Sequence, residues 1–175
     1  MPQVVPPVMT PFDPDYSLVP EENLRQAARD IERAIQAEDE GFEVRDHDGL
    51  VFDTETIRNA IAGRLGRAGL VDELRSQQFA YEDRRGTLSI LRGSAYNAAT
   101  SRQDRNRHAL IVTNENNMRW QLYEGVVKAN DFRSRALDAV RAIFTEARRE
   151  VMPAGQPYQD MDGELRLING ERPVN

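Results

Sequence analysis

The chain has 175 residues, of which 39% are hydrophobic and 30% charged, and its formal net charge at pH 7 is −6. This length suits one domain that buries a sizeable core, and the composition is too apolar for a wholly disordered chain. The absence of cysteine excludes disulfides, thiolate metal sites and cysteine nucleophiles. An acidic chain is also a poor candidate for sequence-independent binding to nucleic acid, which requires a net basic surface.

The N-terminal end of the chain is rich in proline. Six of the nine prolines lie within residues 1–20, and proline fixes φ and removes a backbone donor. We therefore expect residues 1–19 to form an extended leader and residues 171–175 to form a short tail. The first residues lack the basic segment and the apolar core that mark a secretion signal.

Residues 20–80 are predicted to form an N-terminal helical extension. Pro20 suits the first position of a helix. Leu24, Ile31 and Ile35 then recur at helical spacing and predict one apolar face. We expect this first helix to end at a glycine, Gly41.

The rest of this extension is predicted to hold a turn and more helix. Residues 46–49 read Asp-His-Asp-Gly between two apolar triplets and predict a short hairpin turn. A second helix, capped by Asp53 or Thr54, is expected to end at Gly69. Residues 70–78 are expected to add a further short turn of helix.

Residues 81–170 are predicted to form the main helical domain. Residues 87–91 alternate polar and apolar side chains and indicate a strand. Helices are expected over 103–129 and 132–150, and their tight connection requires antiparallel packing. Asp162-Gly163 predicts a C-terminal β-hairpin. The predicted fold is therefore mainly α with small β-hairpins (α+β), an antiparallel helical hairpin plus short strands.

Charge is unevenly distributed along the chain. Residues 13–55 hold 14 acids and four arginines, a local net charge of −10. Residues 84–107 hold six arginines against Asp104 alone, a local net charge of +5. The basic segment could meet an anion, or it could lie against the acidic segment or be solvated.

The residue types that support chemistry do not form recognisable motifs. His47 and His108 stand outside any nucleophile or metal pattern. Asp160-x-Asp162-Gly163 resembles the start of a calcium loop but lacks two of its ligand positions. Neither a phosphate-binding nor a dinucleotide-binding glycine pattern occurs. We therefore predict no catalytic residue, no metal site and no cofactor.

Seven residues are candidates for binding a partner, and they combine arginines with polar and aromatic side chains. They are Arg84, Arg85, Arg92, Asn116, Arg119, Tyr123 and Tyr158. Asn116 and Arg119 share one helix face, and this ridge could meet a partner or bond to the adjacent loop. Arg119 precedes Tyr123 by one turn and could stack on it.

The last hundred residues resemble the YdbL-like family of exported bacterial proteins, in its longer lipoprotein-like form. The residues that carry the resemblance fall in three groups along the chain: Glu82, Gly86 and Leu88; Asn116, Arg119, Leu122 and Tyr123; Pro153, Tyr158, Gln159, Asp162 and Gly163. The chain departs from the family pattern at Tyr81, Thr87, Ala154 and Leu165. Residues 1–70 lie outside the short form of the family.

The resemblance implies an exported, non-catalytic protein that acts with an AsmA-like lipid-transfer bridge and a small lipoprotein. The implied role is chaperone-like, controlling how the β-strands of the lipoprotein stack. Such a role needs an exposed strand edge or groove. Residues 87–91 and the terminal hairpin are the candidate strands.

The resemblance also implies a periplasmic location, with a possible membrane tether through an N-terminal anchor that is missing from this chain. The residues alone fit a cytoplasmic location equally well. Two alternative functions remain open. One is a carboxylate-dependent envelope hydrolase, and the other is an anion-binding or lipid-headgroup-binding module that uses the arginines of residues 84–107.

Overall fold

We describe the fold from a computed structural model, in which residues 14–170 can be placed. Most of the predicted leader and all of the predicted tail lie outside the described residues. The helices are α1 (Glu21–Gln36), α2 (Glu55–Leu65), α3 (Ala68–Ser76), α4 (Ser94–Ala99), α5 (Arg102–Ala129) and α6 (Leu137–Val151). Two short 3₁₀ helices span Tyr16–Leu18 and Ser134–Ala136. No helix among the described residues is both long and apolar enough to cross a membrane.

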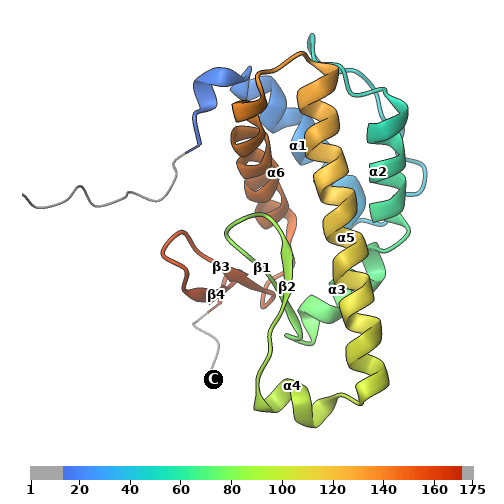
Figure 1. The fold of residues 1–175 in the computed structure, drawn as a ribbon, viewed down its shortest axis with the longest axis vertical. Coiled ribbons are helices and arrows are strands. Elements are labelled where there is room, and N and C mark those ends of the chain that lie inside the picture. The colour runs from blue at the N-terminus through green and yellow to red at the C-terminus, as the bar shows by residue number, and fades with distance from the viewer. Residues whose placement is uncertain (1–13, 171–175) are drawn as a thin grey trace, which may run out of the picture.

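The helices form a bundle around the long helix α5 (Figure 1). α1 packs mainly on α6, and α2 packs mainly on α5. α5 and α6 contact one another and are joined by a short connection, so they form the predicted antiparallel helical hairpin. The predicted α+β class is confirmed, because helices dominate and four short strands form one mixed sheet.

The sheet lies against one end of the bundle (Figure 1) and has the order β2-β1-β3-β4. Its strands are β1 (Ala80–Glu82), β2 (Leu88–Ile90), β3 (Pro157–Gln159) and β4 (Leu165–Leu167). β1 pairs antiparallel with β2 and parallel with β3, and β3 pairs antiparallel with β4. β2 and the C-terminal hairpin coincide with the predicted strands, whereas β1 and α4 were not predicted.

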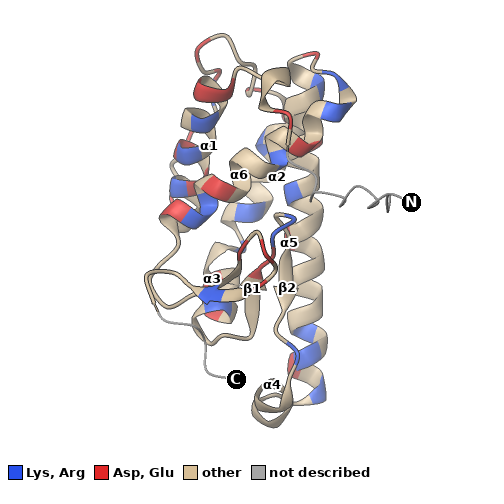
Figure 2. Cartoon of the chain, turned by 90° about the vertical axis from the view of Figure 1, so that its left-hand side faces the viewer, with Lys and Arg blue, Asp and Glu red and all other residues tan. Residues whose placement is uncertain are grey.

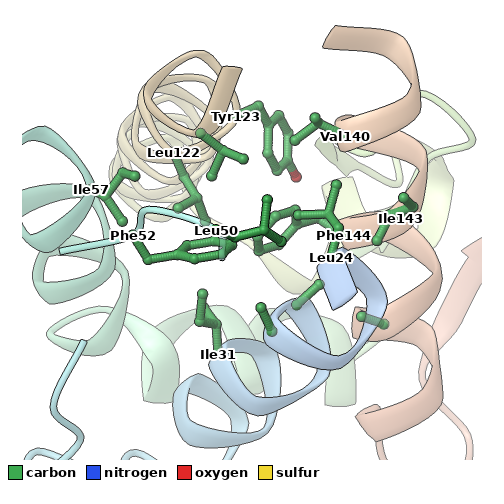
Figure 3. Close-up of a cluster of buried hydrophobic side chains, with 14 of the residues drawn as sticks. Leu24, Ile31, Leu50, Phe52, Ile57, Leu122, Tyr123, Val140, Ile143 and Phe144 are labelled. Carbon is green, nitrogen blue, oxygen red and sulfur yellow. The ribbon is translucent and has the colours of Figure 1, made fainter. Parts of the chain in front are cut away.

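The hydrophobic core joins the N-terminal helices to the C-terminal ones (Figure 3). Leu24 from α1 and Phe144 from α6 are fully buried in it, together with Leu122 from α5. Burial of a side chain of this size contributes about 1.5–3 kcal/mol. Leu50 and Phe52 complete the core from the loop between α1 and α2. Residues 20–80 and 81–170 therefore share one core.

Three helices are followed by a non-glycine residue in the left-handed conformation. Glu38, Gln78 and Asp131 follow α1, α3 and α5, and each has a positive φ between 52° and 57°. After α1, the Asp39 N–H donates to the Ala34 carbonyl and the Glu38 N–H donates to the Ile35 carbonyl. This pattern is the Schellman motif. α1 therefore ends at Gln36, before the expected Gly41, because a non-glycine residue takes the left-handed position.

The predicted hairpin at residues 46–49 forms a turn without strands. His47 and Leu50 exchange backbone hydrogen bonds across Asp48 and Gly49, which both have positive φ. The ladder stops there, because Val51 bonds instead to the side chain of Asn130. The Val51 N–H donates to the amide oxygen of Asn130 at 2.7 Å, and the amide nitrogen of Asn130 donates to the Val51 carbonyl at 3.0 Å. The side-chain amide of Asn130, the C-cap residue of α5, thus takes the place of a paired strand.

α2 begins as predicted and ends early. Thr54 is its N-cap and accepts a hydrogen bond from the Ile57 N–H. The helix ends at Leu65, with Gly66 as its C-cap, and a new helix follows from Ala68. The expected stop at Gly69 therefore lies within the first turn of α3.

We expect Gly86→Ala to destabilise the protein more than Gly155→Ala. Both glycines have positive φ, 79° and 84°, so both substitutions carry the cost of a left-handed alanine, about 1–2 kcal/mol. A Cβ at Gly86 would lie 2.3 Å from the Thr145 Oγ1, whereas nothing lies within 4 Å at Gly155. The clash should add about 1–3 kcal/mol. Urea denaturation would measure both values, and equal losses would contradict the close packing of the β1–β2 turn on α6.

Candidate functional site

Seven charged side chains form a buried network at the centre of the described chain. They are Glu32, Arg64, Arg75, Glu82, Glu115, Arg119 and Arg148, and none is more than 4% exposed. They come from α1, α2, α3, β1, α5 and α6. Four arginines and three glutamates give the network a formal charge of +1. Charged residues are rarely buried to this extent unless they are paired.

One half of the network is organised by Arg119. Its guanidinium donates to both carboxylate oxygens of Glu82, at 2.6 and 3.0 Å, and its Nε donates to Glu115 at 2.8 Å. Arg75 also donates to Glu82, at 3.0 Å. Bidentate pairs of this kind fix orientation as well as charge. β1 is therefore held to α3 and α5 through one carboxylate.

The other half is organised by Glu32. Arg64 donates to both of its oxygens, at 2.8 and 3.0 Å, and Arg148 donates to it at 3.0 Å. The Nε of Arg64 also donates to Glu115 at 2.9 Å and so joins the two halves. Arg148 further donates to the Tyr123 hydroxyl at 2.8 Å.

The network leaves very little internal space. A cavity of about 20 Å³ lies among its side chains, including Arg64, Arg75 and Glu115. Such a volume suits about one water molecule. This cavity is therefore too small for an organic substrate.

The three buried carboxylates are held in their charged form. Burial alone would raise the pKa of Glu115, but Arg64 and Arg119 outweigh burial and lower this pKa to about 2. The pKa of Glu82 is lowered in the same way by Arg119 and Arg148, and that of Glu32 by Arg148 and Arg64. A general acid at neutral pH requires the opposite shift. The geometry and charge of the network therefore suit a structural frame.

The outer edge of β4 is the open edge of the sheet. The Asp160 N–H donates to the Glu164 carbonyl and the Ile168 N–H to the Gln156 carbonyl, so Glu164, Arg166 and Ile168 face β3. Because bonding directions alternate along a strand, the N–H and C=O of Leu165 point away from β3. No segment within residues 14–170 pairs with this side of β4.

The opposite edge of the sheet is covered by a side chain. Asn116 on α5 accepts from the Leu88 N–H at 2.8 Å and donates to the Leu88 carbonyl at 2.9 Å. Both outward-facing backbone groups of Leu88 in β2 are therefore satisfied. Of the two predicted strand segments, the terminal hairpin presents the accessible edge.

A groove of about 430 Å³ lies beside the sheet and includes Leu165 of β4 in its lining. Phe79, Leu91 and Tyr96 supply its other large apolar surfaces. The rings of Phe79 and Tyr96 meet edge to face with centroids 5.3 Å apart. Volumes of this size are typical of binding sites. An open strand edge and an apolar groove therefore meet at Leu165.

The structure separates the candidate binding residues into three places. Arg119 and Tyr123 lie inside the buried network, and Asn116 covers the edge of β2. Arg84, Arg85 and Arg92 are exposed; the first two lie in the turn between β1 and β2, and Arg92 lies in the loop that follows β2. Tyr158 in β3 is half-buried, with the guanidinium of Arg149 5.2 Å from the centre of its ring.

Two open interpretations of these residues are resolved by their contacts. Asn116 bonds to the adjacent backbone, so the loop interpretation applies to it. Arg119 is committed to Glu82 and Glu115, and it is Arg148 that contacts the Tyr123 hydroxyl. The expected stacking of Arg119 on Tyr123 is therefore replaced by ion pairing, which a buried guanidinium requires.

Five members of the network were not singled out from the sequence: Glu32, Arg64, Arg75, Glu115 and Arg148. A signal was present, because Glu32 stands beside Ile31 and between Ala28 and Ile35 on the apolar face of α1. A charged residue at an apolar position of a helix is a sign of a buried partner. The sequence could not show which arginine that partner is.

The six arginines of the basic segment are not neutralised by the acidic segment. In the described part of the chain, none of them is within ion-pair distance of a carboxylate. Those at the start of α5 cluster at the end of the molecule that carries α4 (Figure 2). Glu32, which belongs to the acidic segment, pairs instead with Arg64 and Arg148 inside the bundle.

Comparisons with known proteins find no matching family model, no matching curated protein and no matching solved structure. The resemblance to the YdbL-like family therefore stays a prediction that rests on the residues quoted above.

We expect Glu115→Gln to destabilise the protein by about 3 kcal/mol at pH 7. The difference between the unfolded pKa and the folded pKa of about 2 corresponds to a free energy of this size. Removal of one partner from a buried ion pair costs a similar amount. The folded pKa lies below the unfolded value of about 4.3, so this contribution is complete above that pH. It is lost as the pH falls towards 2. The free energy of unfolding of the variant should therefore depend less steeply on pH in this range.

Urea denaturation between pH 2 and pH 7 would measure this difference. Glu43→Gln is the matched control, since Glu43 is exposed and pairs only with the exposed Arg45. Equal stability of the Glu115 variant and the wild type at pH 7 would contradict a stabilising role for the network.

Proposed function

We propose that this protein is a non-catalytic component of the bacterial cell envelope that accepts an extended segment of another protein on the outer edge of β4. In this role it serves as a chaperone-like or scaffold partner of an AsmA-like lipid-transfer system. The observation that carries the proposal is the open backbone edge at Leu165, next to an apolar groove.

Strand addition at this edge follows from ordinary sheet chemistry. An incoming strand gains main-chain hydrogen bonds from the edge and gains specificity from pockets for alternate side chains. Leu165 offers both, because its N–H and C=O point outward while its side chain lines the groove. The edge of β2 is occupied by Asn116, so an added strand is directed to β4.

The choice of partner and location rests on the family resemblance. Members of the YdbL-like family look like exported proteins that act with a lipid-transfer bridge and a small lipoprotein. A tether at the N-terminus, if the native protein has one, would hold the β4 edge near such partners. The stacking of lipoprotein strands is the kind of process that a single accepting edge could control.

The state of the buried carboxylates favours this proposal over an envelope hydrolase. Glu32, Glu82 and Glu115 are each paired with at least two arginines and have lowered pKa values. They line or adjoin a cavity with room for about one water molecule. A carboxylate-dependent hydrolysis would need an accessible pair with separated pKa values.

A second candidate function is the binding of anionic lipid headgroups by the basic segment. Arg102 and Arg107 are exposed at the start of α5 and have no carboxylate partner among the described residues. Arg92 is exposed near the same end of the molecule. Unpaired arginines of this kind suit phosphate groups.

We expect Leu165→Pro to weaken the binding of a fluorescent decapeptide of alternating valine and threonine by about tenfold. Proline removes the outward N–H that an added strand would use. The loss of this hydrogen bond and of the main-chain hydrogen bonds beside it accounts for a tenfold loss of affinity. The ladder to β3 should survive, since this N–H does not take part in it. Fluorescence anisotropy would measure the affinity.

Met161→Pro serves as the control, because Met161 is exposed in the same hairpin and lies off the edge. Circular dichroism would check that both variants fold. Failure of the peptide to bind the wild-type protein would refute strand acceptance. A photo-crosslinker at position 165 in the native envelope would test the partner: a lipid-transfer bridge or lipoprotein supports the proposal, and a metabolic complex overturns it.

For the second candidate, we expect vesicles that contain anionic phospholipid to bind the wild-type protein at low salt. The double variant Arg102→Glu, Arg107→Glu should bind them severalfold more weakly, because exposed charges act through a screened field. Arg33→Glu makes the same kind of charge change on α1, outside the basic segment. Vesicle sedimentation would measure binding, and binding that is insensitive to salt or equal in all variants would exclude the headgroup function.

A further inference from the structure

We infer that the segment accepted beside β4 carries an apolar side chain and, two residues along on the same face of the strand, an acidic side chain, so that the groove takes the first and Arg92 takes the second. This inference rests on the proposed strand acceptance and adds the chemistry of the partner. It concerns the part of the groove that lies between Leu165, Tyr96 and Arg92.

The apolar half of the groove is built on a rigid aromatic cluster. Phe79 packs edge to face against Tyr96, and both rings lie within 6 Å of the His108 ring. The Tyr96 hydroxyl is hydrogen-bonded to Nδ1 of His108 at 3.1 Å. Tyr96 is buried, although it lines the groove. A preformed apolar surface of this kind binds a side chain at little entropic cost.

The polar half of the groove is electropositive. Arg92 lines the groove, is exposed and has no carboxylate partner within residues 14–170. Arg105 lies near enough to act electrostatically on Tyr96 together with Arg92, and their influence is opposed there by Asp104. Asp104 is engaged by Ser101 in the capping box of α5. An unpaired arginine at the rim of an apolar groove favours an acidic ligand group.

The same features disfavour a second copy of this chain as the occupant. β4 carries Arg166 between its two leucines. Each Arg166 is paired with Asp160 of its own hairpin at 2.7 Å. Antiparallel pairing of two such strands about their centres would place these arginines opposite one another, where like charges disfavour close approach. The chemistry of the edge and groove therefore fits a heterologous strand with acidic character.

The inference can be tested with three fluorescent decapeptides that share one alternating valine–threonine frame and a central leucine. They differ only in the second residue after the leucine, which lies on the same face of the strand as the leucine and is glutamate, glutamine or lysine. At low salt, the wild-type protein should bind the glutamate peptide about threefold to tenfold more tightly than the lysine peptide, as expected for a partly exposed charge pair. Added salt should reduce this ratio towards one.

Arg92→Glu should reverse the order of the peptides, so that the lysine peptide binds more tightly. Arg85→Glu is the matched control, because Arg85 is also exposed and the variant makes the same charge change outside the lining of the groove. It should leave the order unchanged. Arg92 makes no ion pair in the described part of the chain, so the variant should keep the urea midpoint of the wild type.

The possible failures are distinguishable. If all three peptides bind equally, the acidic preference is refuted while strand acceptance stands. If none binds, both the inference and the proposed function are refuted. If Arg85→Glu reverses the order as well, the preference reflects overall charge and the assignment to Arg92 is overturned. Self-association of the protein in sedimentation, with no peptide binding, would assign the edge to a second copy and refute the inference.

Discussion

The structure depends on the pairing of arginines with glutamates at its centre. Taking ions out of water is costly, and only mutual attraction and further hydrogen bonds offset that cost. Glu32, Glu82 and Glu115 each accept from two or more guanidinium groups. Since the partners come from six different elements, the network specifies how the sheet sits on the bundle as well as how the helices pack.

Helices with a clear apolar stripe could be predicted from the sequence, and features that depend on distant partners could not. α5 and α6 follow from their periodicity, and Thr54 from its capping chemistry. β1 has three residues, and its place is set by the pairing of Glu82 with Arg119, which no local pattern reveals. Arg119 and Tyr123 were identified as candidates, but their burial depends on arginines and glutamates elsewhere in the chain. The end of α1 before Glu38 was missed because glycine is the usual residue at left-handed positions, whereas the predicted end of α5 at residue 129 matches the structure.

Two asparagines, Asn116 on α5 and Asn130 at its C-cap, act as substitutes for strands. Asn116 bonds to both backbone groups of Leu88, and Asn130 bonds to both backbone groups of Val51. A carboxamide presents one donor and one acceptor side by side, as a peptide group does. Each asparagine therefore completes an extended segment that would otherwise need a neighbouring strand. This arrangement explains why Leu50 and Phe52 can enter the core from a loop, and why the accessible edge of the sheet is at β4.

The cover that Asn116 provides for β2 also has a consequence for stoichiometry. Head-to-tail growth of a sheet through many molecules requires two complementary edges on each one. Within residues 14–170, the sheet has an open edge at β4, whereas at β2 the side-chain amide of Asn116 bonds to the outward backbone groups of Leu88. A molecule with this asymmetry can receive a single strand and then presents no further template on its far side. Under the strand acceptance proposed above, such a molecule would end a growing stack of strands.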